Sequence, residues 1–236
     1  MADLPVVLVH GIRVTGSMWS PVRSLLRSPS AAPDLPGHGS LSGMPYDMDA
    51  ACDVVAECIA GLGGRALVAG LSLGGYVGIA TAARHPSMVA GLVAIGCTAR
   101  PGGAFARVYR LAGRLAAGYP ALANRISASG FRRALPGPAG EAVVAGGLFC
   151  EVVPSVVEAV TSEDPVVSLA RYPGRVWLVN GARDPFRVNE LDFLRACRNG
   201  SLTRISGRGH LTVLAAPDRM AGFLDQAADA VRDRAA

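Results

Sequence analysis

Short apolar runs alternate along the chain with longer segments of helical periodicity. The runs continuous enough for buried parallel strands lie at residues 6–9, 66–69, 89–95 and 176–179, and a further strand is predicted at 202–205, where apolar and polar residues mix. Between them, apolar residues recur at helical spacing, most clearly from Met48 to Leu62, where Gly63 and Gly64 predict the helix end. Strands that alternate with helices predict a parallel sheet flanked by helices.

Weaker patterns complete this α/β arrangement. We expect helices at residues 17–26, 76–84 and 191–198, and a closing helix that carries Met220, Phe223, Leu224, Ala227 and Val231 on one face. Residues 31–34 have poor strand propensity, and only their position in the alternation predicts a strand there. Counted together, the elements predict about six strands, mostly parallel.

The alternation breaks after Thr98. Residues 100–170 show helical but no clear strand periodicity, which predicts a core of residues 1–99 and 171–236 with residues 100–170 inserted as a helical cap. In the first cap helix one face is apolar and the opposite face, expected to be solvated, carries arginines; the two sets are Phe105, Val108, Ala112 and Leu115, and Arg107, Arg110 and Arg114. The inner surface of such a lid can line a pocket.

Composition narrows the functional classes. The 23 basic residues, all arginine, exceed the 18 acidic ones, but they are scattered and accompany no recognition motif, so we expect no nucleic-acid partner. The five widely spaced cysteines favour a reducing compartment. With no long apolar run and no basic segment ahead of the first strand, the sequence predicts a cytoplasmic protein without a membrane partner. Oligomeric state is left open.

A Gly-x-Ser-x-Gly pattern spans residues 70–74, between a predicted strand and a predicted helix. In that context the pattern is typical of a turn so sharp that the serine hydroxyl stands exposed above the N-terminus of the helix. Ser72 is therefore the candidate nucleophile. The pattern alone is common, and a polar turn with a solvated hydroxyl is the alternative interpretation.

A serine hydroxyl needs an adjacent base to attack a carbonyl at neutral pH. Of the four histidines, His210 alone follows the last predicted strand, and Gly207 and Gly209 suit a loop that returns the imidazole over the sheet edge. His210 is the candidate base. Asp164, which precedes Pro165, is interpreted as a turn or helix-cap residue.

Four motifs in order give the chain a resemblance to the α/β-hydrolase superfamily. They are His10-Gly11 after the first strand, the loop from Asp34 to Gly39 (Asp-Leu-Pro-Gly-His-Gly), the Ser72 turn, and the pair Asp184 and His210. The resemblance covers nearly everything except the cap. It implies the α/β-hydrolase fold and, since an acid follows the strand at 176–179, it assigns Asp184 as the carboxylate that orients His210.

The resemblance also implies an oxyanion hole made by the backbone N–H groups of Ile12 and Leu73, and a structural role for Asp34 and His38. Arg13 lies beside this loop, where it can meet a substrate carboxylate or phosphate or form a solvent-facing salt bridge. The side chains of Trp19, Met44 and Tyr46 either form walls of a pocket or pack in the core, and the sequence leaves both roles open.

The expected function is that of a serine hydrolase without cofactor or metal, which cleaves an ester, thioester or lactone of a small molecule with an acyl carbonyl through an acyl-enzyme on Ser72. Two alternatives stay open. One is carbon–carbon bond hydrolysis or cyclisation in natural-product tailoring, and the other is a small-ligand receptor on the same scaffold. Serine rather than aspartate at position 72 speaks against epoxide hydrolysis and haloalkane dehalogenation.

Overall fold

Six parallel strands form one central sheet. The computed structural model describes residues 3–232, with 104–106 described by their backbone alone, so the ends of the expected core (1–2 and 233–236) lie outside the described residues. The strand order is β2-β1-β3-β4-β5-β6. The strands are β1 Val6–Val9, β2 Ser30–Ala31, β3 Ala66–Leu71, β4 Val89–Ile95, β5 Arg175–Gly181 and β6 Asn199–Ile205. Each pair is parallel, which confirms the predicted sheet.

Burial explains which strands were visible in the sequence. Every residue of β1, β3 and β4 is buried, so these strands are continuous apolar runs. The edge strand β6 begins at Asn199. The sequence predicted a start at residue 202, because the first residues of the strand are not apolar and are at least partly exposed. The other edge strand, β2, is only two residues long and ends before Pro33, which has no N–H for the ladder.

Helices cover both faces of the sheet, and alternate strand residues feed two hydrophobic clusters. One face packs under α2 (Met48–Gly61), α3 (Leu73–Arg84) and α9 (Glu190–Ala196). The other packs under α1 (Ser20–Arg23) and α10 (Pro217–Arg232). The helix expected at 17–26 is divided into the 3₁₀ turn η1 (Gly16–Trp19) and α1, because Pro21 lacks the N–H that would bond to the Ser17 carbonyl.

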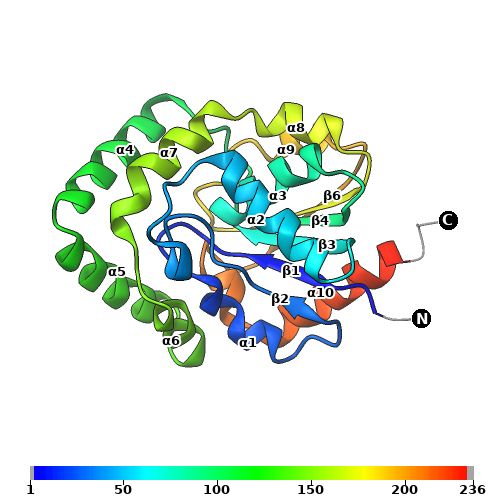
Figure 1. Cartoon of the computed structure of the whole chain (residues 1–236), viewed down its shortest axis with the longest axis horizontal. Helices are drawn as coiled ribbons and strands as arrows, with labels where there is room; N and C mark the ends of the chain where they lie inside the picture. The colour runs from blue at the N-terminus through cyan, green and yellow to red at the C-terminus, as the bar shows by residue number, and fades with distance from the viewer. Residues whose placement is uncertain (1–2, 233–236) are drawn as a thin grey trace.

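Between β4 and β5 the described chain is helical. The helices are α4 (Gly103–Gly118), α5 (Pro120–Ala134), α6 (Pro138–Ala145), the 3₁₀ turn η3 (Cys150–Val152), α7 (Val153–Ser162) and α8 (Pro165–Arg171). Figure 1 shows α4, α5 and α6 along one rim of the molecule, and α7 lies against α4 on the side toward the sheet. The last helix, α8, packs on α3 and α9, and Asp164 caps it through bonds from Val166 N and Val167 N, as expected.

The apolar face of α4 points outward rather than toward the sheet. Val108, Leu111 and Leu115 are 68%, 61% and 65% exposed. The inward position is Gly113, where an added Cβ would collide with Val153 at the start of α7. A glycine lets the two helix backbones approach closely, so the small residue rather than the large apolar ones determines which face of α4 is buried.

The arginines of α4 divide between two environments. Arg107 and Arg114 are exposed, as expected. The solvated environment expected for Arg110 is wrong, because this residue is half-buried and its Nε is shielded from solvent. The side chain of Phe105 lies outside the described residues.

Among the helices of residues 3–232, none alone is long and apolar enough to cross a membrane. Helix α6 and the segment Cys150–Ser162, which are bent by 68° relative to each other, reach that length and composition only together.

Candidate active site

Ser72 occupies a strained turn between β3 and α3. Its φ is +58°, a conformation that is uncommon for residues other than glycine. The Ser72 N–H donates to the Ile95 carbonyl at 2.8 Å, and the Ser72 carbonyl accepts from the N–H groups of Gly75 and Tyr76. The backbone is therefore fixed on both sides, while the Ser72 hydroxyl makes no hydrogen bond with any described residue.

Glycines make this turn possible. An added Cβ at Gly70 would collide with the Gly74 carbonyl, and one at Gly74 would collide with the Val9 carbonyl. At Gly75 it would meet the Cys97 sulfur. The turn brings three backbone segments so close together that no side chain fits between them, which gives a physical reason for the glycines on both sides of Ser72.

The structure brings Asp184 and His210 together at the carboxyl end of the sheet. His210 Nδ1 lies 2.9 Å from Asp184 Oδ2. The second carboxylate oxygen, Oδ1, accepts from the Phe186 N–H at 2.8 Å, so both oxygens are engaged, and the Asp184 side chain is fully buried. Because a carboxylate only accepts, Nδ1 carries the proton, and Nε2 of a neutral imidazole is left with a lone pair.

Close backbone contacts hold the two loops that carry this pair. The Arg183 N–H donates to the Arg208 carbonyl at 2.8 Å. Behind the pair, Gly96 has φ +61°, and a Cβ there would lie 3.0 Å from both Asp184 Oδ2 and His210 Nδ1. The Phe186 ring packs on the imidazole with centroids 4.5 Å apart. Neither Gly96 nor Phe186 was predicted from the sequence to have a role at this site.

A buried polar network, also missed from the sequence, fixes the start of α9 behind the Asp184 loop. Glu190 is 4% exposed and accepts hydrogen bonds from Asn180 Nδ2 at 2.9 Å, Arg187 Nε at 3.2 Å and Arg204 Nε at 2.8 Å. Asn180 also donates to Thr98 in the loop after β4. Burial alone would raise the pKa of Glu190, but the bonds from Arg204, Asn180 and Arg187 hold it below its usual value.

Two neutral histidines hold the loop after β1. His10 Nδ1 donates to the Gly11 carbonyl and its Nε2 accepts from the Leu35 N–H at 2.9 Å. His38 Nδ1 donates to the Pro36 carbonyl and its Nε2 accepts from the Arg13 N–H at 3.1 Å. Burial lowers the pKa of His10 to about 3 and also lowers that of His38. Both imidazoles are therefore backbone acceptors in the neutral form.

Asp34 supports the same loop. Its carboxylate accepts from the Gly16 N–H and from the N–H and hydroxyl of Ser40, and these bonds lower its pKa against the opposing effect of burial. The contacts of Asp34 and of His38 are structural in kind, as the resemblance implies. Beside them, the N–H of Ile12 and that of Leu73, the first residue of α3, have no hydrogen-bond partner among the described residues.

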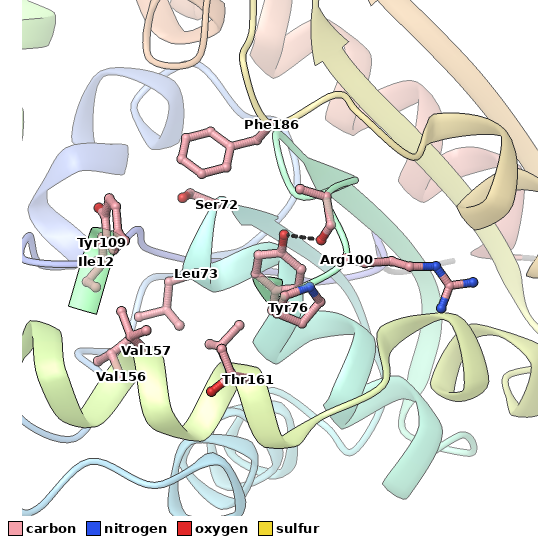
Figure 2. Close-up of a pocket in the computed structure, with 14 residues that line it drawn as sticks. Ile12, Ser72, Leu73, Tyr76, Arg100, Tyr109, Val156, Val157, Thr161 and Phe186 are labelled. Carbon is pink, nitrogen blue, oxygen red and sulfur yellow. Dashed lines mark hydrogen bonds between the residues drawn. The ribbon is translucent and has the colours of Figure 1, made fainter. Parts of the chain in front are cut away.

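Two cavities meet at Ser72. The first holds about 610 Å³ of empty space, part of it open to solvent, and Figure 2 shows Phe186 above Ser72 with the side chains of Val156, Val157 and Thr161 projecting from α7 below. Most of its wall is apolar, and the hydroxyl of Tyr76 is bound to the Ala99 carbonyl at 2.7 Å. An apolar wall beside the Ser72 hydroxyl suits an apolar part of a small molecule.

The second cavity holds about 720 Å³ of empty space, part of it open to solvent, and shares four lining residues with the first, namely Ile12, Ser72, Tyr109 and Phe186. It adds Arg13, Phe131, His210 and Leu211. The wall residues considered from the sequence lie elsewhere, because Trp19 and Tyr46 are buried in the core and Met44 is exposed. Among the described residues, no three His, Cys, Asp or Glu side chains gather as metal ligands would.

Curated esterases and lipases resemble the chain in sequence over about a third of their own length. A pimeloyl-[acyl-carrier protein] methyl ester esterase of Neisseria meningitidis is 40% identical over 90 residues, which are 37% of this chain and 34% of that protein. Lipase LipV of Mycobacterium tuberculosis is 38% identical over 91 residues, 37% of this chain and 35% of that lipase.

Solved structures resemble it over nearly the whole chain. An esterase from Thermogutta terrifontis superimposes with a TM-score of 0.79 at 23% identity, covering 98% of this chain and 91% of the esterase. An enol-lactonase from Burkholderia xenovorans gives 0.77 at 19% identity, with 99% and 93% covered. At these identities the similarity establishes the fold alone. The family model of the alpha/beta hydrolases matches residues 6–223, and the chain therefore belongs to the alpha/beta hydrolase family.

Proposed function

We propose that this protein is a serine hydrolase that cleaves an ester, thioester or lactone of a small molecule through an acyl-enzyme on Ser72, without a cofactor. One observation carries the proposal. The unbonded hydroxyl of Ser72, in a strained turn, lines the same cavity as an imidazole whose Nδ1 is held by the buried carboxylate of Asp184. The esterase and lipase relatives support the same reaction class.

In the first half of the reaction, the Ser72 oxygen attacks the acyl carbonyl while Nε2 of His210 takes the hydroxyl proton. Asp184 keeps the proton on Nδ1 and stabilises the imidazolium that forms. The imidazolium then gives its proton to the leaving alcohol or thiol as the acyl bond breaks. Water, activated by the same imidazole, releases the acid and restores Ser72.

Charge develops on the carbonyl oxygen during each attack, and two backbone donors are available for it. The N–H groups of Ile12 and Leu73 have no other partner among the described residues, and Leu73 begins α3, where the positive end of the helix dipole favours an anion. Removing one such donor from other enzymes lowers the rate by about 10²–10³.

The helices of residues 100–170 act in this proposal as a cap that determines the substrate. Val156, Val157 and Thr161 of α7 and Tyr109 of α4 line the cavities at Ser72. Because these walls are mostly apolar, the cap favours an acyl compound that is largely apolar.

Turnover of a panel of short p-nitrophenyl esters, thioesters and lactones tests the proposal. The wild-type protein is expected to hydrolyse at least one class, and Ser72→Ala is expected to lose at least 10³-fold, or about 4 kcal/mol of transition-state stabilisation. Wild-type turnover that survives in Ser72→Ala at an equal rate would refute the acyl-enzyme. A wild type without turnover on any class would favour the receptor or carbon–carbon bond alternatives.

A further inference from the structure

Arg13 lines the second cavity together with Ser72 and His210, and it is the residue next to Ile12. The residue is half-buried. None of the lining residues of this cavity is an aspartate or a glutamate, so Arg13 gives the cavity a positive charge beside the candidate nucleophile. The Asp184 carboxylate lies nearby but is buried behind His210 and is engaged by it.

The backbone at position 13 does not itself require an arginine. Arg13 has φ +73°, which is strained for a residue with a side chain and which glycine would adopt at lower cost. The conformation is held by the Arg13 N–H bonded to His38 and by the Arg13 carbonyl, which accepts from the Phe149 N–H at 2.9 Å. These bonds fix the direction in which the side chain leaves the loop.

The guanidinium is positioned but not neutralised. It lies over the Phe131 ring at 5.5 Å from the centroid, and Nη1 donates to Ser127 Oγ at 3.3 Å. Arg13 forms no ion pair with any described carboxylate, and its Nε is buried without a hydrogen-bond partner. The solvent-facing salt bridge considered from the sequence is therefore wrong for the described residues.

A half-buried cation with an unused hydrogen-bond donor is unfavourable unless a ligand supplies the missing acceptor and the opposite charge. The planar guanidinium fork matches a carboxylate, which it binds through two parallel hydrogen bonds. A phosphate monoester carries nearly two negative charges, and the cavity offers one arginine and a histidine that must be neutral to act as a base. A carboxylate therefore matches the charge better.

We propose that Arg13 binds a carboxylate group of the substrate, so that the enzyme acts on acyl compounds that carry a second, ionised carboxyl group. This inference rests on the proposed hydrolase function and names its substrate class. The carboxylate would occupy the second cavity, and the apolar remainder of the substrate the first. Phe131 and Ser127 of α5 act as positioning residues for the guanidinium.

Matched substrate pairs test the proposal by turnover. p-Nitrophenyl hydrogen glutarate and p-nitrophenyl valerate differ mainly by a carboxylate in the acyl chain, and 4-acetoxybenzoate and its methyl ester differ by one in the leaving group. We expect the wild type to prefer the anionic member of at least one pair. Arg13→Met should reduce that preference by about ten- to a hundredfold, the range for a lost charge-assisted bond.

Arg132→Met is the control, since it removes the same charge from α5, where Arg132 pairs with Glu141 and lines neither cavity. Its ratio of anionic to neutral turnover should equal that of the wild type. Arg13→Lys, which retains the charge but not the fork, should give an intermediate ratio. Equal ratios in the wild type and Arg13→Met would overturn the proposal.

A binding measurement separates this proposal from the hydrolase proposal and does not depend on turnover. Calorimetry on Ser72→Ala with 4-phenylbutyrate and 4-phenylbutanamide should show tighter binding of the acid, and Ser72→Ala/Arg13→Met should lose that difference. Should the acid bind no better than the amide, the carboxylate site is refuted even if Ser72 is the nucleophile. Should Ser72→Ala retain turnover, only the acyl-enzyme is refuted.

Discussion

His210 and Asp184 form a hydrogen bond of 2.9 Å between Nδ1 and Oδ2. The other carboxylate oxygen of Asp184 accepts from the Phe186 N–H, and the whole side chain is buried. The imidazole is thereby held in one tautomer, with Nδ1 protonated and Nε2 available. Since Phe186 supplies both the N–H that binds Asp184 and the ring that covers His210, one short loop sets the orientation of both residues.

Asp184→Asn should abolish most turnover while leaving the protein folded. An asparagine can keep the shape of the site, but its amide favours the wrong imidazole tautomer, and the same change in a Ser-His-Asp protease lowers kcat about 10⁴-fold. The measurement is kcat on the best p-nitrophenyl ester, with circular dichroism as the folding control. An undiminished kcat would move the acid to another residue.

Gly96→Ala should damage the site more than the fold. The added methyl would lie 3.0 Å from both Asp184 Oδ2 and His210 Nδ1. The alanine would also have to keep the left-handed φ of Gly96, which costs about 1–2 kcal/mol. Gly64→Ala is a matched control, because Gly64 also has a positive φ but nothing lies within 4 Å of its added Cβ. Both variants should lose similar stability in urea, and only Gly96→Ala should lose turnover. Equal activities would mean that the pair tolerates displacement.

Glu190→Gln should destabilise the fold by about 1.5–3 kcal/mol, the range for a lost hydrogen bond to a charged group. The amide cannot accept from Asn180, Arg187 and Arg204 as a carboxylate does. Glu141→Gln, which breaks a solvent-exposed pair with Arg132, serves as control and should change the stability much less than Glu190→Gln does. Urea unfolding of both variants decides whether the network is structural, and equal losses would contradict the prediction.

Acid should unfold the protein partly through His10. Its pKa is about 3 in the fold against 6.5 in the unfolded chain, so the unfolded state binds more protons and stability falls as pH falls below about 6.5. For this group alone, the free energy of unfolding should be about 2 kcal/mol lower at pH 5 than at pH 7. His38 shifts the same way.

Urea unfolding at both pH values measures this dependence. His10→Gln, which can still accept from the Leu35 N–H, should flatten the slope. A slope that is the same in the wild type and in His10→Gln would assign the acid sensitivity to other groups.

The sequence predicted those parts of the molecule whose signal is local. Buried strands such as β1 and β4 are apolar throughout, and the Ser72 turn requires glycines that can be read in the chain. His210 was predicted as the base from its place beyond β6, and Asp184 was assigned as the acid through the resemblance to the α/β hydrolases. The structure brings the two side chains into contact.

Other features depend on contacts that no local pattern encodes. Helical periodicity identified two faces of α4, but the close approach at Gly113 decides which one is buried. In the sequence Glu190 is an ordinary acidic residue at the start of a helix. Its partners Asn180, Arg187 and Arg204 surround it only because the fold packs α9 against the ends of β5 and β6. The lack of a carboxylate partner for Arg13 likewise appears only when the cavity is formed.

Covalent labelling of Ser72 tests the central proposal most directly. The wild type should react stoichiometrically with a fluorophosphonate, with the adduct mapped by mass spectrometry to the peptide that contains Ser72. Ser72→Ala should not react, and Asp184→Asn should react far more slowly, since labelling depends on the same base. A folded wild-type protein that remains unlabelled, or an adduct on a residue other than Ser72, would contradict the account.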